Sequence, residues 1–234
     1  MSKEEPDTAA NGADAPSWRE QAVARSLDSA RTRAENRVQR FLDAALELMA
    51  EGDRKDFTVQ EVVERSGQSL RSFYQYFGGK HELLLGLFEE SVRTTTAQLA
   101  KRIDSKGGEE PVDRLHTFVV EYYKMCQPPR KGKGREALPS PILVRFALQL
   151  LTAHPAESSR AFVPLVSLFD ELLLAAIDAG AIRSDLNRQA VTGPVLQVIM
   201  FNTFSSAIVD GADDLSAQDG AEALWDVVVN GLGA

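Results

Sequence analysis

The chain has 234 residues and a formal net charge of −8, and 44% of its residues are hydrophobic. This length accommodates one small and one larger domain, and the apolar fraction is sufficient for a packed core. The acidic balance argues against a general nucleic-acid coat protein, and the single cysteine, Cys126, excludes an internal disulfide framework and fits a reducing cytoplasm. The scattered histidines His81, His116 and His154 show no zinc-ligand spacing, so neither a metal site nor a cofactor is predicted.

The first 33 residues are an extension ahead of the first predicted domain. Residues 1–16 are rich in Ala, Asp, Glu, Gly and Pro and are expected to be disordered. Residues 17–33 carry one tryptophan and four arginines, namely Trp18, Arg19, Arg25, Arg31 and Arg33. Two interpretations stay open for this segment: a frayed, partly helical extension of the next helix, or a basic arm for a polyanionic partner.

A first amphipathic helix is predicted by apolar residues that recur on one face: Val38, Phe41, Leu42, Ala45, Leu48 and Met49. The helix is expected to end at Glu51-Gly52-Asp53. A second helix should begin after Thr58, which forms a capping-box pattern with Glu61.

A sharp turn and a third helix follow. Gly67 stands where the chain has to reverse and is expected to adopt positive φ. Ser69 is the expected N-cap of the next helix, whose apolar face is formed by Leu70, Phe73 and Phe77. The stretch from Arg65 to Lys80 contains three cations and no carboxylate, which indicates a surface for phosphate. This pattern is typical of a helix-turn-helix, although an ordinary helical hairpin is the alternative.

The longer string resembles the DNA-binding domain of the TetR (tetracycline-repressor) family of bacterial regulators over roughly residues 34–90. The matching residues are Ser66-Gly67-x-Ser69-x-x-Ser72-Phe73-Tyr74-x-Tyr76-Phe77-x-x-Lys80-x-x-Leu83-Leu84. The residue after the turn glycine is usually small and apolar in that family, but here it is Gln68. This departure makes the turn more polar or lets Gln68 itself reach DNA.

The resemblance implies a role for each matching residue. Bases would be read by Gln68, Ser69, Leu70 and Arg71, with Arg71 as first choice because a guanidinium binds guanine in a bidentate way. The DNA backbone would be contacted by Thr58, Tyr74 and Lys80, whereas Tyr76 could face either DNA or the core. If residues 17–33 are an arm, they would enter the minor groove or lie along the backbone.

The predicted fold is all-α. Residues 34–80 form a three-helix helix-turn-helix domain, and residues 81–234 form a helical ligand-binding and dimerisation domain. Further helices are expected over residues 80–103, 111–127, 141–153, 156–179, 187–210 and 217–231. Residues 128–141 are a basic loop rich in Gly and Pro, whose cations bind an anion or remain solvated.

Residues 189–209 contain no charged side chain and approach the length that spans a bilayer. Several polar side chains and the Gly193-Pro194 step favour a buried helix instead. The N-terminus lacks a charged-then-apolar signal pattern, so we expect a cytoplasmic protein that associates with the nucleoid, with no membrane contact.

The resemblance also implies two functions for the second domain. Its helices would enclose a pocket for a small effector, which the low charge of these helices predicts to be lipophilic or acyl-like. The candidate pocket residues are Phe118, Tyr122, Met125, Phe146, Leu150, Phe162, Phe169 and Met200. Its last helices would form a homodimer through Leu196, Ile199, Phe204, Ile208, Leu224, Trp225 and Val228, although some of these residues would fill the protomer core instead.

The function predicted from these features is a homodimeric repressor that binds a pseudo-palindromic operator and is released by its effector. A regulator without a ligand, or an architectural DNA-binding dimer, is the alternative, and the sequence does not determine whether regulation is negative or positive. An enzyme is not predicted, because the sequence has no paired carboxylates, Ser-His-Asp set, nucleophile elbow or phosphate loop.

Overall fold

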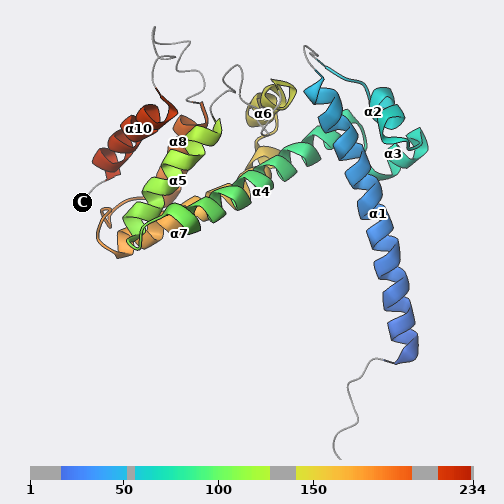
Figure 1. The fold of residues 1–234 in the computed structure, drawn as a ribbon, viewed down its shortest axis with the longest axis horizontal. Coiled ribbons are helices and arrows are strands. Elements are labelled where there is room, and N and C mark those ends of the chain that lie inside the picture. Colours follow the sequence, from blue (N-terminus) through green and yellow to red (C-terminus); the bar gives the residue numbers. More distant parts are fainter. Residues whose placement is uncertain (1–16, 52–55, 127–140, 202–215, 233–234) are drawn as a thin grey trace, which may run out of the picture.

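The structure is a computed structural model that describes residues 17–51, 56–126, 141–201 and 216–232 (Figure 1). Within these ranges the chain forms nine helices and no strand, so the all-α prediction is confirmed. The helices are α1 (Trp18–Ala50), α2 (Val59–Ser66), α3 (Leu70–Tyr76), α4 (Lys80–Lys106), α5 (Pro111–Cys126), α6 (Pro141–Ala153), α7 (Pro155–Asp178), α8 (Arg188–Phe201) and α10 (Ala217–Leu232).

The C-terminal part of α1 packs with α2, α3 and the first turns of α4 into a small module, which we call the head. Its centre is aromatic: the ring of Phe41 meets that of Phe73 at 5.4 Å and that of Phe77 at 6.1 Å, both edge-on. Leu83 of α4 is fully buried with them. The apolar spacing in the sequence is therefore satisfied by one contiguous core.

Helix α1 begins well before the head. It starts at Trp18, where Ser17 and Glu20 form a capping box, and its first buried residue is Phe41. The preceding turns project away from the molecule (Figure 1). Residues 18–33 are thus a helical continuation of α1, which agrees with the first of the two interpretations of this segment, whereas the disorder expected for residues 1–16 lies outside the described residues.

Helix α4 belongs to both halves of the molecule. Its first turns bury Leu83, Leu84 and Leu87, and its last turns bury Leu99 and Ile103. The distal half packs against α5 and α7, which also pack against each other. One uninterrupted helix therefore joins the head to the rest of the described molecule.

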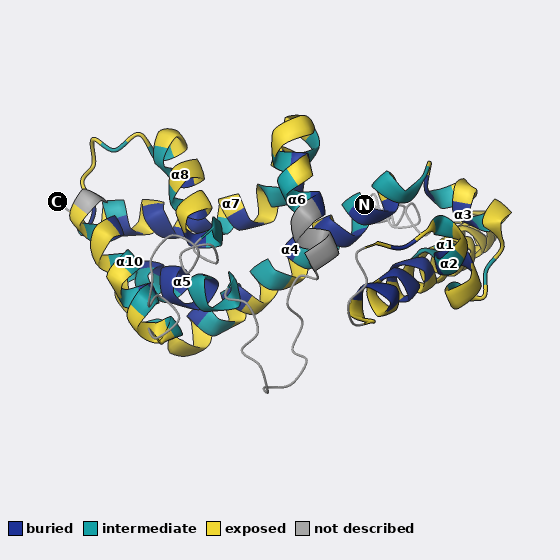
Figure 2. Cartoon of the chain, turned by 90° about the horizontal axis from the view of Figure 1, so that it is seen from above, coloured by how far each residue is buried: buried dark blue, intermediate teal, exposed yellow. Residues whose placement is uncertain are grey.

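The larger unit, which we call the ligand domain, is built around α5. This helix contacts α4, α7, α8 and α10, and α6 covers parts of α4 and α7. Buried residues line the facing sides of these helices in Figure 2. The described bounds differ from the predicted ones by only a few residues, but residues 202–210 of the predicted 187–210 helix lie outside the described part.

A buried carboxylate ties α4 to α5. Glu121 is only 4% exposed and accepts from Arg102 at 2.9 Å, from Lys106 at 3.0 Å and from Lys124 at 3.3 Å. Burial raises its pKa, but the hydrogen bonds from Lys106 and Arg102 outweigh burial, so that the pKa of Glu121 lies below its ordinary value.

Among the described residues, no helix combines the length and the apolar character needed to cross a membrane. Helix α8 buries Thr192, Leu196 and Ile199 against the rest of the protomer but exposes its other side, including Val198, so the expected helix buried on most sides is wrong for the described residues of this segment. Residues 202–209 lie outside the described part.

Candidate nucleic-acid interface and ligand domain

The turn between α2 and α3 is determined by local hydrogen bonds. Thr58 Oγ1 accepts from the Glu61 amide at 3.2 Å, and the Glu61 carboxylate accepts from the Thr58 amide at 2.7 Å, so the predicted capping box is present. Gly67 has φ of 64°, and a Cβ there would meet no atom within 4 Å. The glycine is therefore required by backbone conformation and not by crowding.

Helix α3 presents a polar face to solvent and an aromatic face to the core. Ser69 caps it, since its Oγ accepts from the Ser72 amide at 3.1 Å. Leu70 is 43% exposed and Tyr74 is 56% exposed, and Arg71 is also exposed. Phe73 is fully buried. The spacing therefore predicted the buried positions of Phe73 and Phe77 correctly, but it was wrong for Leu70, which lies on the exposed face with Arg71 and Tyr74.

The three cations of this stretch are not equivalent. Arg65 bridges α2 to α1 through Glu51 at 2.5 Å and Glu47 at 3.4 Å. The Lys80 ammonium donates to the carboxylate of Asp56 and to the carbonyl of Phe57. Two of the three cations that indicated a surface for phosphate are therefore engaged within the chain.

Arg71 differs from the other two cations. In the parts of the chain that the structure describes, its guanidinium has no hydrogen bond or ion pair, and it points from the exposed face of α3. Tyr76 is only half-buried and packs against the core. Thr58 is exposed at the N-terminus of α2.

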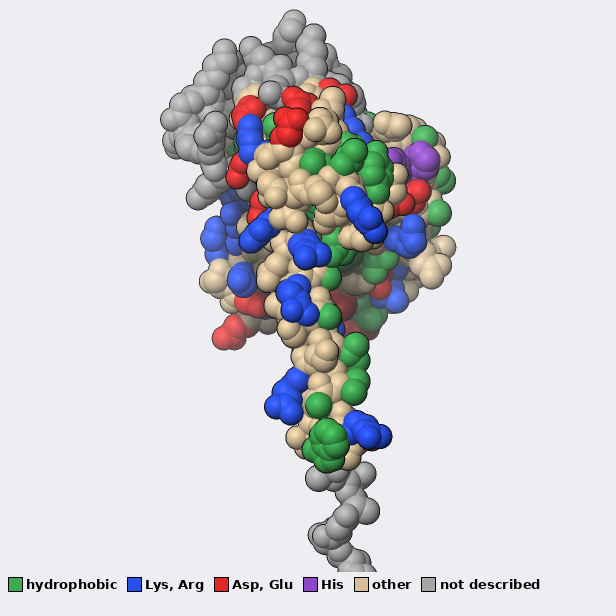
Figure 3. Space-filling view, turned by 90° about the vertical axis from the view of Figure 1, so that its right-hand side faces the viewer, with side chains coloured by type: hydrophobic (Ala, Val, Ile, Leu, Met, Phe, Trp, Pro, Cys, Tyr) green, Lys and Arg blue, Asp and Glu red, His purple; other side chains and the backbone are tan. Residues whose placement is uncertain are grey.

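A surface hollow lies between α1 and the turn that joins α2 to α3. It is lined by Arg33, Asn36, Arg37 and Arg40 of α1 and by Gln68. The three arginines recur at intervals of four and three residues, which places them on one helical face. Figure 3 shows blue side chains, which on this helix are all arginines, spread along the projecting part of α1. The sequence analysis missed the arginines of this hollow beyond Arg33, although their helical spacing was a signal for them.

The candidate pocket residues divide into two groups. The ring of Phe118 packs against Phe169 at 5.2 Å and Tyr122 at 5.8 Å in the centre of the ligand domain. Closer to the head, Phe146 lies against His81 and Phe162 lies against Phe88, each at 5.3 Å between ring centroids. Leu150 is fully buried, and Met125 and Met200 are half-buried. The set therefore lines a packed interior.

Polar atoms at this interior are held in their neutral form. Burial raises the pKa of the Cys126 thiol to about 12, although a hydrogen bond with Tyr122 opposes that shift. Burial also raises the pKa of Tyr122 well above its ordinary value. A charged ligand group would find few partners among these side chains.

The candidate interface residues are only partly available at the surface. Ile199 is fully buried in the protomer, and Leu196 and Val228 are nearly so, which corrects their expected place in a dimer interface. Leu224 and Trp225 are half-buried against the core. Phe204 and Ile208 lie outside the described residues. The apolar side chains that α8 and α10 do expose are Val198, at 54%, and Val227, at 71%.

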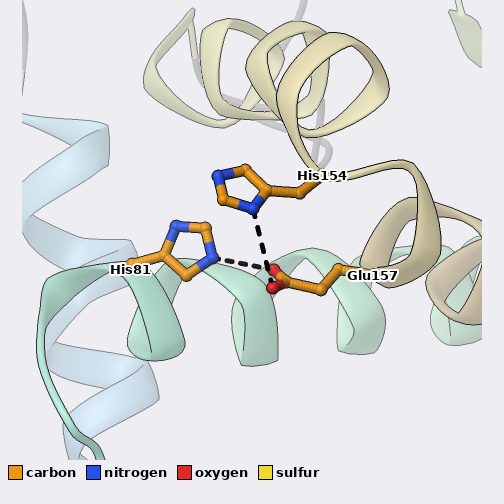
Figure 4. Close-up of side chains that lie close together, drawn as sticks. All are labelled: His81, His154 and Glu157. Atoms are coloured by element: carbon orange, nitrogen blue, oxygen red, sulfur yellow. Dashed lines mark hydrogen bonds and ion pairs between the residues drawn. The ribbon is translucent and has the colours of Figure 1, made fainter.

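The structure also groups residues that the sequence scatters. His81, His154 and Glu157 lie together where α4 meets the junction of α6 and α7 (Figure 4). The third histidine, His116, pairs with Glu222 at 2.7 Å. No local spacing could have predicted the first cluster, because His81 and His154 are remote in sequence.

Comparisons with known proteins agree with this architecture. The model of the family described as bacterial regulatory proteins, tetR family, matches residues 41–87. The fatty acid metabolism regulator protein of Bacillus subtilis (strain 168) is 20% identical over 167 residues, which are 70% of this chain and 81% of that protein.

Two solved structures share the fold. Thermus thermophilus FadR, a TetR-family transcriptional repressor in complex with lauroyl-CoA, has a TM-score of 0.60 at 18% identity, covering 84% of this chain and 95% of that chain. RolR in complex with resorcinol has a TM-score of 0.61 at 17% identity, covering 87% and 91%. The match to both halves places the helix-turn-helix and the helical domain in one known architecture.

Proposed function

We propose that this chain, which belongs to the tetR family of bacterial regulatory proteins, is a transcriptional repressor that an acyl-type effector releases from its operator. The more general function that the comparisons support is that of a DNA-binding regulator controlled by a small ligand. The observation that carries the proposal is the exposed face of α3, where Arg71 has no hydrogen bond or ion pair among the described residues while the aromatic side packs into the head.

DNA contact would combine base reading with backbone anchoring. The side chains of Gln68, Ser69, Leu70 and Arg71 would approach base edges in the major groove, and Thr58 and Tyr74 would bind phosphates on either side. Lys80 would add a phosphate contact in one of two ways. Its ammonium would bind the phosphate while it keeps its hydrogen bond to the Asp56 carboxylate, or it would exchange that carboxylate for the phosphate.

Helix α1 would extend this contact along the DNA backbone. Its first part, through Arg40, carries six arginines against three carboxylates. The arginines of the hollow lie beside Gln68, so they are placed to neutralise phosphates flanking the groove that α3 enters. The helical conformation supports backbone contact over insertion of an extended arm into the minor groove.

The effector is proposed to be a long-chain acyl compound. The interior around Phe118 and Phe169 is apolar, and the neutral Cys126 thiol adds no charge to it. The Bacillus subtilis relative is a regulator of fatty acid metabolism, and the Thermus thermophilus structure holds lauroyl-CoA. An acyl chain would displace or separate these packed side chains, and α4 would carry the movement to the head.

A homodimer would set the spacing of the two reading helices. Two α3 helices about 34–36 Å apart enter successive major grooves of a pseudo-palindromic site. The exposed Val198 and Val227 on α8 and α10 are the proposed contacts in place of the buried residues beside them. Phe204 and Ile208 remain candidates from the sequence.

Fluorescence anisotropy of a labelled operator tests the proposal. The operator is first selected from random DNA with the full chain, and the dissociation constant is then measured with lauroyl-CoA, stearoyl-CoA, free CoA or resorcinol. We expect the acyl-CoAs to weaken binding at least tenfold, a coupling free energy of about 1.4 kcal/mol. Free CoA is the matched control because it lacks only the acyl chain.

Each outcome bears on a different part of the proposal. Release by resorcinol alone would replace the acyl chain with a small aromatic effector. Equal DNA affinity in the presence of every compound would reject the acyl effector but leave operator binding intact. Failure to select any DNA sequence would reject the repressor itself.

A further inference from the structure

The cluster of His81, His154 and Glu157 brings three metal-ligating side chains from two helices together. His81 is the second residue of α4, His154 is the N-cap of α7, and Glu157 lies in the first turn of α7. Their ligand atoms all lie within 4.8 Å of one another. Figure 4 shows both imidazole rings turned toward the carboxylate, and the two rings lie next to each other, 4.9 Å apart between centroids.

The two oxygens of Glu157 serve different rings. Oε2 lies 2.8 Å from His81 Nε2, and Oε1 lies 3.7 Å from His154 Nδ1. The shorter separation is a hydrogen bond, but the longer one is beyond hydrogen-bond range. Within the described ranges the imidazole of His154 makes no hydrogen bond, so one ligand nitrogen faces the carboxylate with nothing bridging the two.

We propose that this cluster is a binding site for a divalent transition metal ion, with Zn²⁺ as its occupant. Two imidazoles and one carboxylate are the protein ligands of one common class of zinc site, in which water takes the fourth position. Zinc bonds of about 2.0–2.1 Å place tetrahedral ligand atoms about 3.4 Å apart, close to the separation of His154 Nδ1 and Glu157 Oε1. His81 Nε2 and Glu157 Oε2 lie closer, at 2.8 Å, so metal binding would replace their hydrogen bond and require small rotations of both side chains.

Access and chemistry agree with an exchangeable ion. The side chains of His81 and His154 are each 40% exposed, and that of Glu157 is 29% exposed, so an ion and its water enter without unfolding. The imidazole nitrogens favour Zn²⁺ over Mg²⁺ or Ca²⁺, which prefer oxygen ligands.

The position gives the ion a structural consequence that rests on the proposed function. His81 follows Lys80 at the head end of α4, whereas Glu157 belongs to the ligand domain. A bound ion joins these two parts and stabilises their present arrangement by an amount that rises with the logarithm of the zinc concentration above the dissociation constant. By linkage, any change that it makes in DNA affinity is matched by the same change in metal affinity when DNA binds.

The test uses the full chain without a polyhistidine tag. Zinc binding is measured by isothermal titration calorimetry after chelator treatment, and the absorption spectrum with Co²⁺ reports coordination by the protein. The variants are His81→Ala, His154→Ala and Glu157→Gln. His116→Ala is the matched control because His116 also pairs with a glutamate but has no third ligand within the described part of the chain.

We expect one Zn²⁺ per chain, at least a tenfold loss of affinity in each of the three variants, and an unchanged affinity in His116→Ala. Zinc should raise the melting temperature of the wild type and of His116→Ala but not of the other variants. Far-UV circular dichroism and metal-free operator binding confirm that the variants fold. Absence of saturable binding, or equal affinity in all proteins, would overturn the site. Both results leave the DNA-binding proposal standing, since that is measured with chelator.

Discussion

The head and the ligand domain use their polar side chains in opposite ways. On α3 of the head, Arg71 and Tyr74 face solvent, and Arg71 has no partner in the described chain. In the ligand domain, the buried Glu121 is surrounded by three cations from α4 and α5. The head is therefore ready to bind a partner as it stands, whereas the ligand domain has to open a packed core before it accepts one.

The strongest test of this contrast is Phe73→Ala. Phe73 is fully buried against Phe41 and Phe77, so its truncation should destabilise the head by about 3–5 kcal/mol and abolish operator binding. Urea unfolding can be followed by fluorescence of Trp225 in the Trp18→Phe background, since Trp225 lies on α10. We expect the transition of the ligand domain to keep its midpoint.

Tyr74→Phe is the matched control for that variant, because Tyr74 is exposed beside Phe73. It should leave unfolding unchanged. If Phe73→Ala lowered the Trp225 transition as much as the loss of helicity in the head, the two units would unfold together and the contrast drawn here would fail.

Glu121→Gln should cost about 1–3 kcal/mol of stability, since it leaves three partly exposed cations without their carboxylate. The folded pKa of Glu121 is lowered, so its contribution is fully present above the ordinary glutamate pKa and is lost as pH falls through the folded value. Melting temperatures between pH 7 and pH 3 should therefore fall less steeply for the variant. If the melting temperatures of the wild type and of Glu121→Gln fell equally steeply with pH, ionised Glu121 would not contribute this stability.

Lys80→Ala should have two separable effects. Loss of the ammonium's contacts with Asp56 and Phe57 should lower stability by about 1 kcal/mol. If Lys80 also binds phosphate, affinity for all DNA sequences should fall and the slope of log affinity against log salt should flatten by about one unit. A lower melting temperature with an unchanged salt slope would mean that Lys80 stabilises the head but does not bind phosphate.

Ser72→Ala should have the smallest effect. Ser72 Oγ is buried and has no hydrogen-bond partner among the described residues, and alanine has the higher helix propensity. We expect stability to rise by about 0–1 kcal/mol and operator affinity to stay the same. A loss of stability or of DNA affinity would mean that the hydroxyl is bonded in solution or in the complex.

The head could be predicted from sequence because its decisive features are local. The Thr58–Glu61 capping box and the Ser69 cap act within three residues, and Gly67 is required by backbone conformation alone. The apolar spacing of Phe73 and Phe77 also places them in the core without knowledge of their partners. Helix bounds in the ligand domain were predictable for the same reason.

Contacts across the fold could not be predicted in this way. The sequence around Arg65 shows no partner for its charge. Only the packing of α1 against α2 brings Glu47 and Glu51 to it. On α8, Val198 and Ile199 are adjacent in sequence and both are aliphatic. Only packing against the rest of the protomer decides that Ile199 is buried and Val198 is exposed. The cluster of His81, His154 and Glu157 depends wholly on how α4 meets α7.

The central claim, that the free polar face of α3 reads DNA sequence, is tested most directly by binding-site selection with the wild type and with Arg71→Ala. The wild type should select one pseudo-palindromic consensus. The variant should lose preference at one symmetric pair of positions, at a cost of about 1–3 kcal/mol per site, while a parallel selection with Lys80→Ala keeps the full consensus. The same consensus from the wild type and from Arg71→Ala would contradict the assignment of Arg71 as the reading residue.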